Sequence, residues 1–259
     1  LTINMEHHSS EHETKESEVQ PPAQQNNLSI PVAIVIAGVL IAGAVYLGTS
    51  KGASTVAVNN QQGQQAAQQP AGVAVDITKV KTTGEPFVGS PNAPVTMAYW
   101  FDYQCPFCRR FEEDAMTQLM KDYVQTGKVK VVFKDFQFLG PDSQTAGLAE
   151  RAVWDVAPDK FYEWHKAMYD KQDSENSGWG NKIDILALTK SVGIDSAKVD
   201  QLMTSKATQY QKAMDDDKAE GGAFGINGTP GSIIGKNLIS GAQPYAAVKQ
   251  LIDLALQGK

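Results

Sequence analysis

Cysteine is nearly absent from this chain, whose 259 residues include only Cys105 and Cys108. Two cysteines exclude a small scaffold held together by several disulfides, and they leave the redox state of the compartment open. Histidine is scarce as well. Three of the four histidines lie within the first twelve residues, and the fourth is His165. A structural zinc site needs four ligands. The cysteine pair lacks nearby partners for such a site, and we expect no metal.

A strong charge of either sign is also missing. The chain has 23 basic and 29 acidic residues and a formal net charge of −6, and the sequence contains no evident basic face. Proteins that bind nucleic acids carry a basic patch or stripe. We therefore expect no nucleic-acid partner.

Long hydrophobic runs are lacking except at residues 30–48, which carry no charge and are just long enough to span a bilayer as a helix. We predict a polar disordered tail over 1–28, a transmembrane signal-anchor over 29–49, a flexible Gln/Ala-rich linker over 50–75 and a globular domain over 76–259. A cleaved signal peptide is the alternative, because residues 42–44 resemble a small-residue cleavage site. The acidic leader disfavours cleavage, since signal peptides begin with a positively charged region.

The globular part begins with the pattern of a βαβ unit. Residues 95–101 are almost wholly apolar, as in a strand that is buried on both faces. Apolar residues recur every four positions from Phe107 to Tyr123 and predict a helix that is closed by Gly127. Residues 129–133 predict the second strand. The two cysteines therefore lie where the first strand gives way to the helix.

The C-terminal part predicts a hairpin and a last helix. Residues 232–234 and 238–240 read as two strands joined by a short turn, and residues 244–257 as the helix. Four apolar residues are expected on the inner face of this helix, namely Ala247, Leu251, Leu254 and Ala255.

A long helical stretch separates the βαβ unit from the hairpin. Helical spacing occurs near residues 146–156, 160–169, 183–192 and 196–219. We infer a helical subdomain, about residues 141–220, that is inserted into an α/β core.

The sequence Cys105-Pro106-Phe107-Cys108 allows both sulfurs to meet at the start of a helix. There the helix dipole and the free N–H groups stabilise a thiolate, which makes the first sulfur a nucleophile and a good leaving group. We interpret the pair as a dithiol/disulfide redox centre. An inert local disulfide and a metal-binding pair are the alternatives.

Three motifs match the DsbA-like branch of the thioredoxin superfamily in order and spacing. They are FDYQCPFCRRF at 101–111, GINGTP at 225–230 and GAQP at 241–244. Over residues 76–259 the chain thus resembles a DsbA-like thiol–disulfide oxidoreductase, in this case a membrane-anchored member. The expected fold class is α/β, a thioredoxin-like fold with an inserted helical subdomain, preceded by a single N-terminal transmembrane helix and a flexible linker.

The resemblance assigns roles to residues around the cysteines. Cys105 is expected to be the exposed sulfur that forms the mixed disulfide with a substrate, and Cys108 the resolving partner one turn further in. Pro106 starts the helix without the loss of a hydrogen bond. Phe107 and Asp102 are expected to tune the redox centre, with a turn or cap role as the alternative for Asp102. Several strongly oxidising members carry His in place of Phe107, so we expect a weaker oxidant.

The resemblance also implies a substrate-binding loop. Pro230 is expected to be a cis-proline that faces the disulfide, and the backbone of Thr229 beside it can pair with an extended substrate. The family often places a buried carboxylate six residues before the first cysteine, where this chain has Tyr99. No cofactor is implied other than the redox-active Cys105–Cys108 disulfide.

Three other side chains have open roles. Arg109 and Arg110 either add a positive field near the thiolate or are solvated helix residues. His165, within an amphipathic helical pattern, is expected to be a packed or surface histidine rather than a catalyst.

We therefore expect an extracytoplasmic thiol–disulfide oxidoreductase, held at the cell membrane by a single pass, that introduces disulfides into secreted or surface polypeptides. Its partners would be unfolded or reduced secreted polypeptides and a quinone-linked membrane protein that reoxidises the cysteine pair. Two alternatives remain open. One is a thiol reductase or isomerase of the same fold, and the other is a non-enzymatic polypeptide-binding module.

Overall fold

The computed structural model of the chain describes residues 75–258. The predicted tail (1–28), the predicted signal-anchor (29–49) and all but the last residue of the predicted linker lie outside these residues. Within residues 75–258, no helix is both long enough and apolar enough to cross a membrane.

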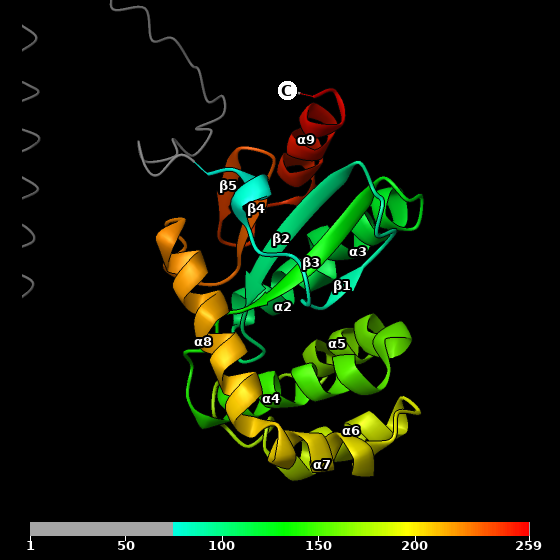
Figure 1. The fold of residues 1–259 in the computed structure, drawn as a ribbon, viewed down its shortest axis with the longest axis vertical. Helices are drawn as coiled ribbons and strands as arrows, with labels where there is room; N and C mark the ends of the chain where they lie inside the picture. Colours follow the sequence, from blue (N-terminus) through cyan, green and yellow to red (C-terminus); the bar gives the residue numbers. More distant parts are fainter. Residues whose placement is uncertain (1–74, 259) are drawn as a thin grey trace, which may run out of the picture. The chain divides into compact units, whose positions relative to one another are not determined.

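A five-stranded mixed sheet in the order β1-β3-β2-β4-β5 forms the centre of the described residues (Figure 1). Its strands are β1 (Phe87–Val88), β2 (Val95–Phe101), β3 (Val129–Asp135), β4 (Gly231–Ile234) and β5 (Asn237–Ser240). The central strands β2 and β3 run parallel, with Val95 opposite Val129. The hairpin of β4 and β5 joins β2 antiparallel, with Ile234 opposite Met97. Strand β2 has the limits that its apolar run predicted.

A continuous helical stretch connects β2 to β3. It comprises α2 (Pro106–Phe111), the π-helical turn η2 (Glu112–Met116), α3 (Thr117–Leu119) and a second π-helical turn η3 (Met120–Val124). The chain leaves the helix at Gly127, whose φ of 73° lies in the left-handed region that glycine adopts without strain. π-helical turns are frequent at functional sites. Their position shortly after the cysteines indicates that this helix belongs to such a site.

The inserted subdomain lies between β3 and β4. Its helices are α4 (Pro141–Val156), η4 (Pro158–Lys160), α5 (Phe161–Asp170), α6 (Lys182–Ser191), α7 (Ser196–Ser205) and α8 (Ala207–Ala223). These limits lie close to the expected 141–220. The single segment predicted over 196–219 is wrong, because Lys206 leaves the helical conformation, with φ −111° and ψ 14°, and divides it into α7 and α8.

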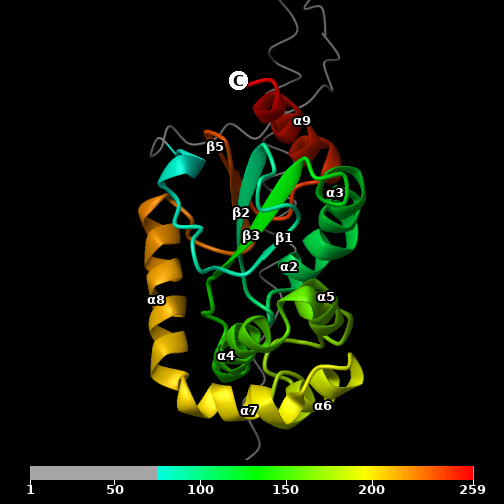
Figure 2. The same cartoon turned by 45° about the vertical axis from the view of Figure 1, so that its right-hand side comes forward.

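Helices cover both faces of the sheet. Figure 2 shows α8 on one face, with α2, α3 and α9 (Tyr245–Leu256) on the other. Because side chains alternate along a strand, Met97, Tyr99 and Phe101 join the large core on the α2 side. Trp100 packs in a smaller core on the opposite side. The strand is thus buried on both faces.

The inner face predicted for α9 is correct in part, because Leu251 and Ala255 pack against the large core. Val248 and Ile252 are the fully buried residues of this helix. Leu254, which we expected inside, is only half-buried. The pattern misled because apolar residues extend around much of this helix.

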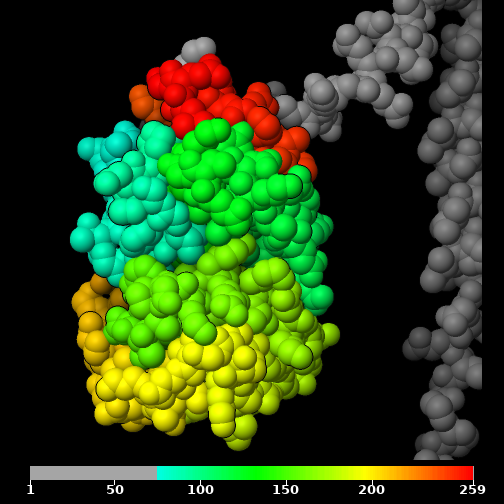
Figure 3. Space-filling view, turned by 90° about the vertical axis from the view of Figure 1, so that its right-hand side faces the viewer, coloured from blue at the N-terminus to red at the C-terminus, as the bar shows by residue number. Residues whose placement is uncertain are grey.

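A cluster of buried charges joins the insert to the sheet. Arg151 of α4 contacts Glu85 Oε2 at 2.6 Å and Asp135 Oδ2 at 2.6 Å through its Nη1 and Nε atoms, and it also pairs with Asp217 of α8. Lys134, at the end of β3, pairs with the same Asp217 and lies 3.5 Å from Glu85. Removal of one partner from such a cluster leaves uncompensated buried charge, which is strongly destabilising. The cluster therefore fixes α4 and α8 relative to β3, and Figure 3 shows the insert packed directly against the strand-bearing part.

Candidate active site

The two cysteines lie at the junction of β2 and α2. Cys105 is the N-cap residue of α2, with extended φ and ψ of −79° and 117°, and Pro106 occupies the first turn. The carbonyl oxygen of Cys105 accepts the first helical hydrogen bonds from the N–H groups of Cys108 (3.1 Å) and Arg109 (3.2 Å). Proline fits this position because it has no N–H to leave unpaired. The predicted helix start is confirmed.

The structure shows both cysteines as free thiols. The thiol of Cys105 donates to the carbonyl oxygen of Thr229 at 3.4 Å, and the Thr229–Pro230 peptide bond is cis, as predicted. Cys108 is fully buried, one turn into the helix. The expectation of an exposed Cys105 is wrong for the residue as a whole, which is only 4% exposed. The carbonyl group of Thr229 lies against its sulfur.

The environments of the two thiols push their pKa values apart. A hydrogen bond from the Cys108 side chain is the main cause that lowers the pKa of Cys105 to about 6. Burial opposes this shift, whereas Thr229 and the N–H groups at the helix start add to it. Burial, followed by the hydrogen bond and the charge of Cys105, raises the pKa of Cys108 well above its usual value. Near neutral pH the pair therefore holds one thiolate, on Cys105, and one thiol.

The side chain between Pro106 and Cys108 is exposed. Phe107 is 54% exposed, and the Arg110 guanidinium lies 5.1 Å from the centre of its ring. Arg109 is held by Glu113 at 2.8 Å and by the carbonyl of Gln172 at 3.0 Å. Neither arginine is among the main influences on the pKa of the Cys105 thiol.

Asp102 fixes the turn in front of Cys105. Its Oδ2 atom accepts from the N–H groups of Phe138 and Leu139 at 2.9 and 3.2 Å and from the hydroxyl of Ser143 at 2.7 Å, while Oδ1 accepts from Gln104 N at 2.9 Å. Burial raises the pKa of Asp102, against these hydrogen bonds. The contacts correspond to the turn or cap role that was the alternative for this residue.

The insert also contacts the cysteine loop directly. Gln172, which follows α5, donates to the carbonyl oxygens of Tyr103 and Cys105 at 2.6 and 3.1 Å. No feature of the sequence singled out this glutamine, because the contact joins parts of the chain 67 residues apart.

His165 is a packed histidine, as expected, but it has two polar partners. Its Nδ1 atom lies 2.8 Å from the hydroxyl of Tyr103, and Nε2 lies 3.1 Å from Oε1 of Glu112. All three side chains are buried. Glu112 was not predicted, although its position four residues after Cys108 places it on the same inner face of the helix.

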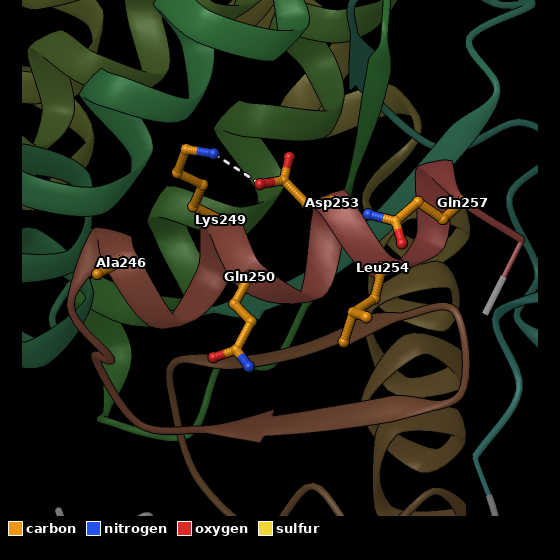
Figure 4. Close-up of a pocket in the computed structure, with 6 residues that line it drawn as sticks. All are labelled: Ala246, Lys249, Gln250, Asp253, Leu254 and Gln257. Carbon is orange, nitrogen blue, oxygen red and sulfur yellow. Dashed lines mark hydrogen bonds and ion pairs between the residues drawn. The ribbon is translucent and has the colours of Figure 1, made fainter.

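Two other kinds of site find little support. In residues 75–258, no group of three or more His, Cys, Asp and Glu side chains is arranged to hold a metal. A hollow of about 420 Å³ on the outer side of α9 is lined by residues of that helix alone (Figure 4). Its charged residues, Lys249 and Asp253, pair with each other at 2.6 Å. This hollow contains neither thiol and offers no free charged group.

Comparison with known proteins shows the family of the chain. The thioredoxin family pattern matches residues 81–254. Disulfide bond formation protein D of Bacillus subtilis (strain 168) is 30% identical over 179 residues, which cover 68% of this chain and 79% of that protein. A protein of Bacillus cereus described as a probable disulfide bond formation protein D is 27% identical over 175 residues, or 66% of this chain and 78% of that protein.

Solved structures agree with this assignment. The oxidised form of BdbD from Bacillus subtilis superimposes with a TM-score of 0.64 and 26% identity, over 71% of this chain and 98% of that one. The thiol-disulfide exchange protein alpha-DsbA2 from Wolbachia pipientis gives a TM-score of 0.58 and 25% identity, over 66% and 86% of the two chains. The chain therefore belongs to the thioredoxin family and is a homologue of the BdbD and DsbA-type disulfide oxidoreductases.

Proposed function

We propose that this protein is an extracytoplasmic thiol–disulfide oxidoreductase that introduces disulfides into secreted or surface polypeptides through Cys105 and Cys108. The observation that carries the proposal is the asymmetry of the pair. Cys105 ionises at a pKa of about 6, and Cys108 is a buried thiol whose pKa is well above the usual value. A stabilised Cys105 thiolate favours the reduced form of the pair, which makes the oxidised form a donor of disulfides.

The reaction proceeds through a mixed disulfide. A substrate thiolate attacks Cys105 Sγ, a substrate–Cys105 disulfide forms, the Cys105–Cys108 bond breaks and its electron pair leaves on Cys108. A second substrate thiolate then attacks the substrate sulfur of the mixed disulfide and releases Cys105 as a thiolate. The substrate loses two electrons and the cysteine pair gains them. Because the Cys105 thiolate has a low pKa, it is a good leaving group in the second step.

Two features around Cys105 suit a polypeptide substrate. The exposed Phe107 offers an apolar contact, and the backbone of Thr229 next to cis-Pro230 lies at the attacked sulfur. An extended chain that pairs with this backbone would bring its own cysteine to Cys105. Pro106 starts the helix that lowers the pKa of Cys105. We propose that no cofactor beyond the cysteine pair takes part.

The proposed location follows from the relatives and from the sequence. The relatives named disulfide bond formation protein support work outside the cytoplasm, where new disulfides persist. The apolar run at 30–48 supports a single-pass membrane anchor, and a quinone-linked membrane protein would return the pair to the disulfide form. A reductase or isomerase would use the same cysteines with electrons supplied to them.

Trapping of the mixed disulfide tests the proposal. In Cys108→Ser the resolving sulfur is missing. The Cys105 thiolate of the full chain should attack a disulfide of an unfolded client polypeptide, release one client sulfur as a thiolate and stay bound to the other as a covalent adduct that dithiothreitol releases. Cys105→Ser is the matched control and should form no adduct. If Cys108→Ser binds the same polypeptides without any covalent adduct, the protein is a binding module and the enzymatic proposal is wrong.

A further inference from the structure

Tyr99 carries a hydroxyl that the fold leaves without a normal hydrogen bond. The side chain is fully buried in β2, and its OH atom has no partner in the described part of the chain. The two other buried tyrosines near the cysteines are both paired, Tyr103 with His165 at 2.8 Å and Tyr169 with the carbonyl of Asp102 at 3.2 Å. Because a buried polar group without a partner is destabilising, such a group calls for an explanation.

The ring of Tyr99 is held in place against the helix that carries Cys108. It stacks on Phe101 and on Phe111, each with ring centres 5.3 Å apart. Phe111 lies three residues after Cys108 and therefore on the same face of α2. The sulfur of Cys108 is an immediate neighbour of the Tyr99 hydroxyl, and both groups are shielded from solvent.

Burial, and then the charge of Cys108, raises the pKa of Tyr99 well above its usual value. The phenol therefore keeps its proton at every pH at which the protein works, so it can donate a hydrogen bond but does not act as a base. While Cys108 is a thiol this hydrogen bond is weak, since neutral sulfur is a weak acceptor. A negatively charged Cys108 supplies the acceptor.

We propose that the Tyr99 hydroxyl donates a hydrogen bond to the Cys108 thiolate at the moment when the Cys105–Cys108 disulfide opens. This inference rests on the proposed exchange function and adds a residue to it. The incoming thiolate forms its bond to Cys105 Sγ, the bond between Cys105 and Cys108 breaks, and the electron pair moves onto Cys108. The Cys108 thiolate then takes up one proton, equal to the one that the incoming thiol lost to solvent when it ionised.

The effect of Tyr99 on this step should be kinetic. Cys108 carries no charge in the disulfide, and near neutral pH it is a thiol again after the step. The hydrogen bond is therefore strongest in the transition state and weak in both stable states. By this argument Tyr99 speeds the opening and its reversal by the same factor and leaves the equilibrium between oxidised and reduced protein unchanged.

Tyr99→Phe tests the inference, because it removes the hydroxyl and keeps the stacked ring. The oxidised full chain is mixed with reduced glutathione near neutral pH, and the opening rate is followed by acid quench and counting of free thiols. With about half of the charge developed on the leaving sulfur, loss of a hydrogen bond to a charged group should slow the opening roughly three- to tenfold. The reduction potential and the melting temperature should not fall. Tyr210→Phe is the control, since its hydroxyl binds Asp155 at 2.7 Å within the insert, and it should open at the wild-type rate.

Each result has one meaning. An opening rate of Tyr99→Phe equal to that of the wild type overturns the inference. A slower rate accompanied by an altered potential or a lower melting temperature also overturns it, because it indicates a structural effect. If the wild-type disulfide itself fails to react with glutathione, the proposed function has failed, which is a different outcome from equal rates in the two proteins.

Discussion

The low pKa of Cys105 can be tested by changing the group that contributes most to it. The hydrogen bond from the Cys108 side chain is the largest influence, and burial opposes it. Cys108→Ala removes this donor, whereas Cys108→Ser keeps a hydroxyl donor at the same position. We expect the pKa of Cys105 to rise in the alanine variant and to remain close to the wild-type value in the serine variant.

The size of the effect follows from the bond that is lost. A hydrogen bond to a charged group contributes about 1.5–3 kcal/mol, and the S–H group is a weak donor, so the lower end applies. About 1.4 kcal/mol corresponds to one pKa unit, which would take Cys105 from about 6 to roughly 7. At pH 6.5 the fraction of Cys105 present as thiolate would fall from about three-quarters to about one-quarter.

Absorbance at 240 nm, at which a thiolate absorbs and a thiol does not, measures this fraction directly. The reduced full chain and the two variants are titrated from pH 4 to pH 9, with Cys105→Ser as the baseline. The reasoning is refuted if the alanine and serine variants titrate with the same midpoint. It is also refuted if the wild-type midpoint lies near the ordinary thiol value, because then the helix start and its neighbours do not stabilise the thiolate.

Two further predictions concern stability. In α8, a Cβ at Gly221 would lie 2.8 Å from Trp100 Nε1, while nothing lies within 4 Å at Gly222. Gly221→Ala should therefore lower the free energy of unfolding, measured by urea titration, by about 1–3 kcal/mol. Gly222→Ala should leave this free energy equal or higher. Equal free energies of unfolding for the two variants would contradict this packing. Burial and the charge of Asp135 raise the pKa of Glu150 well above 4.5. Protonated Glu150 therefore contributes to the stability of the fold, fully below about pH 4.5, and this stability is lost as the pH rises through the raised pKa. Glu150→Gln should not lose this stability as the pH rises. The prediction is wrong if the free energies of unfolding of the wild type and of Glu150→Gln change in parallel with pH.

Local sequence patterns predicted the elements that carry the site. The limits of β2 were predictable because an apolar run ends at the polar Asp102, and the start of α2 because proline follows Cys105. The hairpin was predictable as well, since Gly235 interrupts two short apolar strands and has a φ of 59°. In each case the determining interaction lies within a few residues, so it leaves a signal in the sequence.

Most contacts between distant segments could not be predicted, and the one between Cys105 and Thr229 was expected only from the resemblance to a family. Lys134 and Arg151 look like solvated charges of a strand end and a helix, yet they are buried because Asp217, from a helix far along the chain, pairs with both. Strand β1 has two residues and is too short to produce an alternating pattern. Near the cysteines, Glu112 and His165 meet only when the insert packs on the core. The chemistry of the cysteine motif could therefore be predicted from the sequence, whereas the groups that surround the motif could not.

The reduction potential of the Cys105/Cys108 pair tests the central claim most directly. The full chain is equilibrated with mixtures of reduced and oxidised glutathione at pH 7, and free thiols are counted. A stabilised Cys105 thiolate predicts a potential well above that of thioredoxin, which is about −270 mV. Because residue 107 is phenylalanine and not histidine, the potential should stay below the value of about −120 mV that a strong oxidant of this class reaches. A potential at or below that of thioredoxin would contradict the account and identify the protein as a reductase.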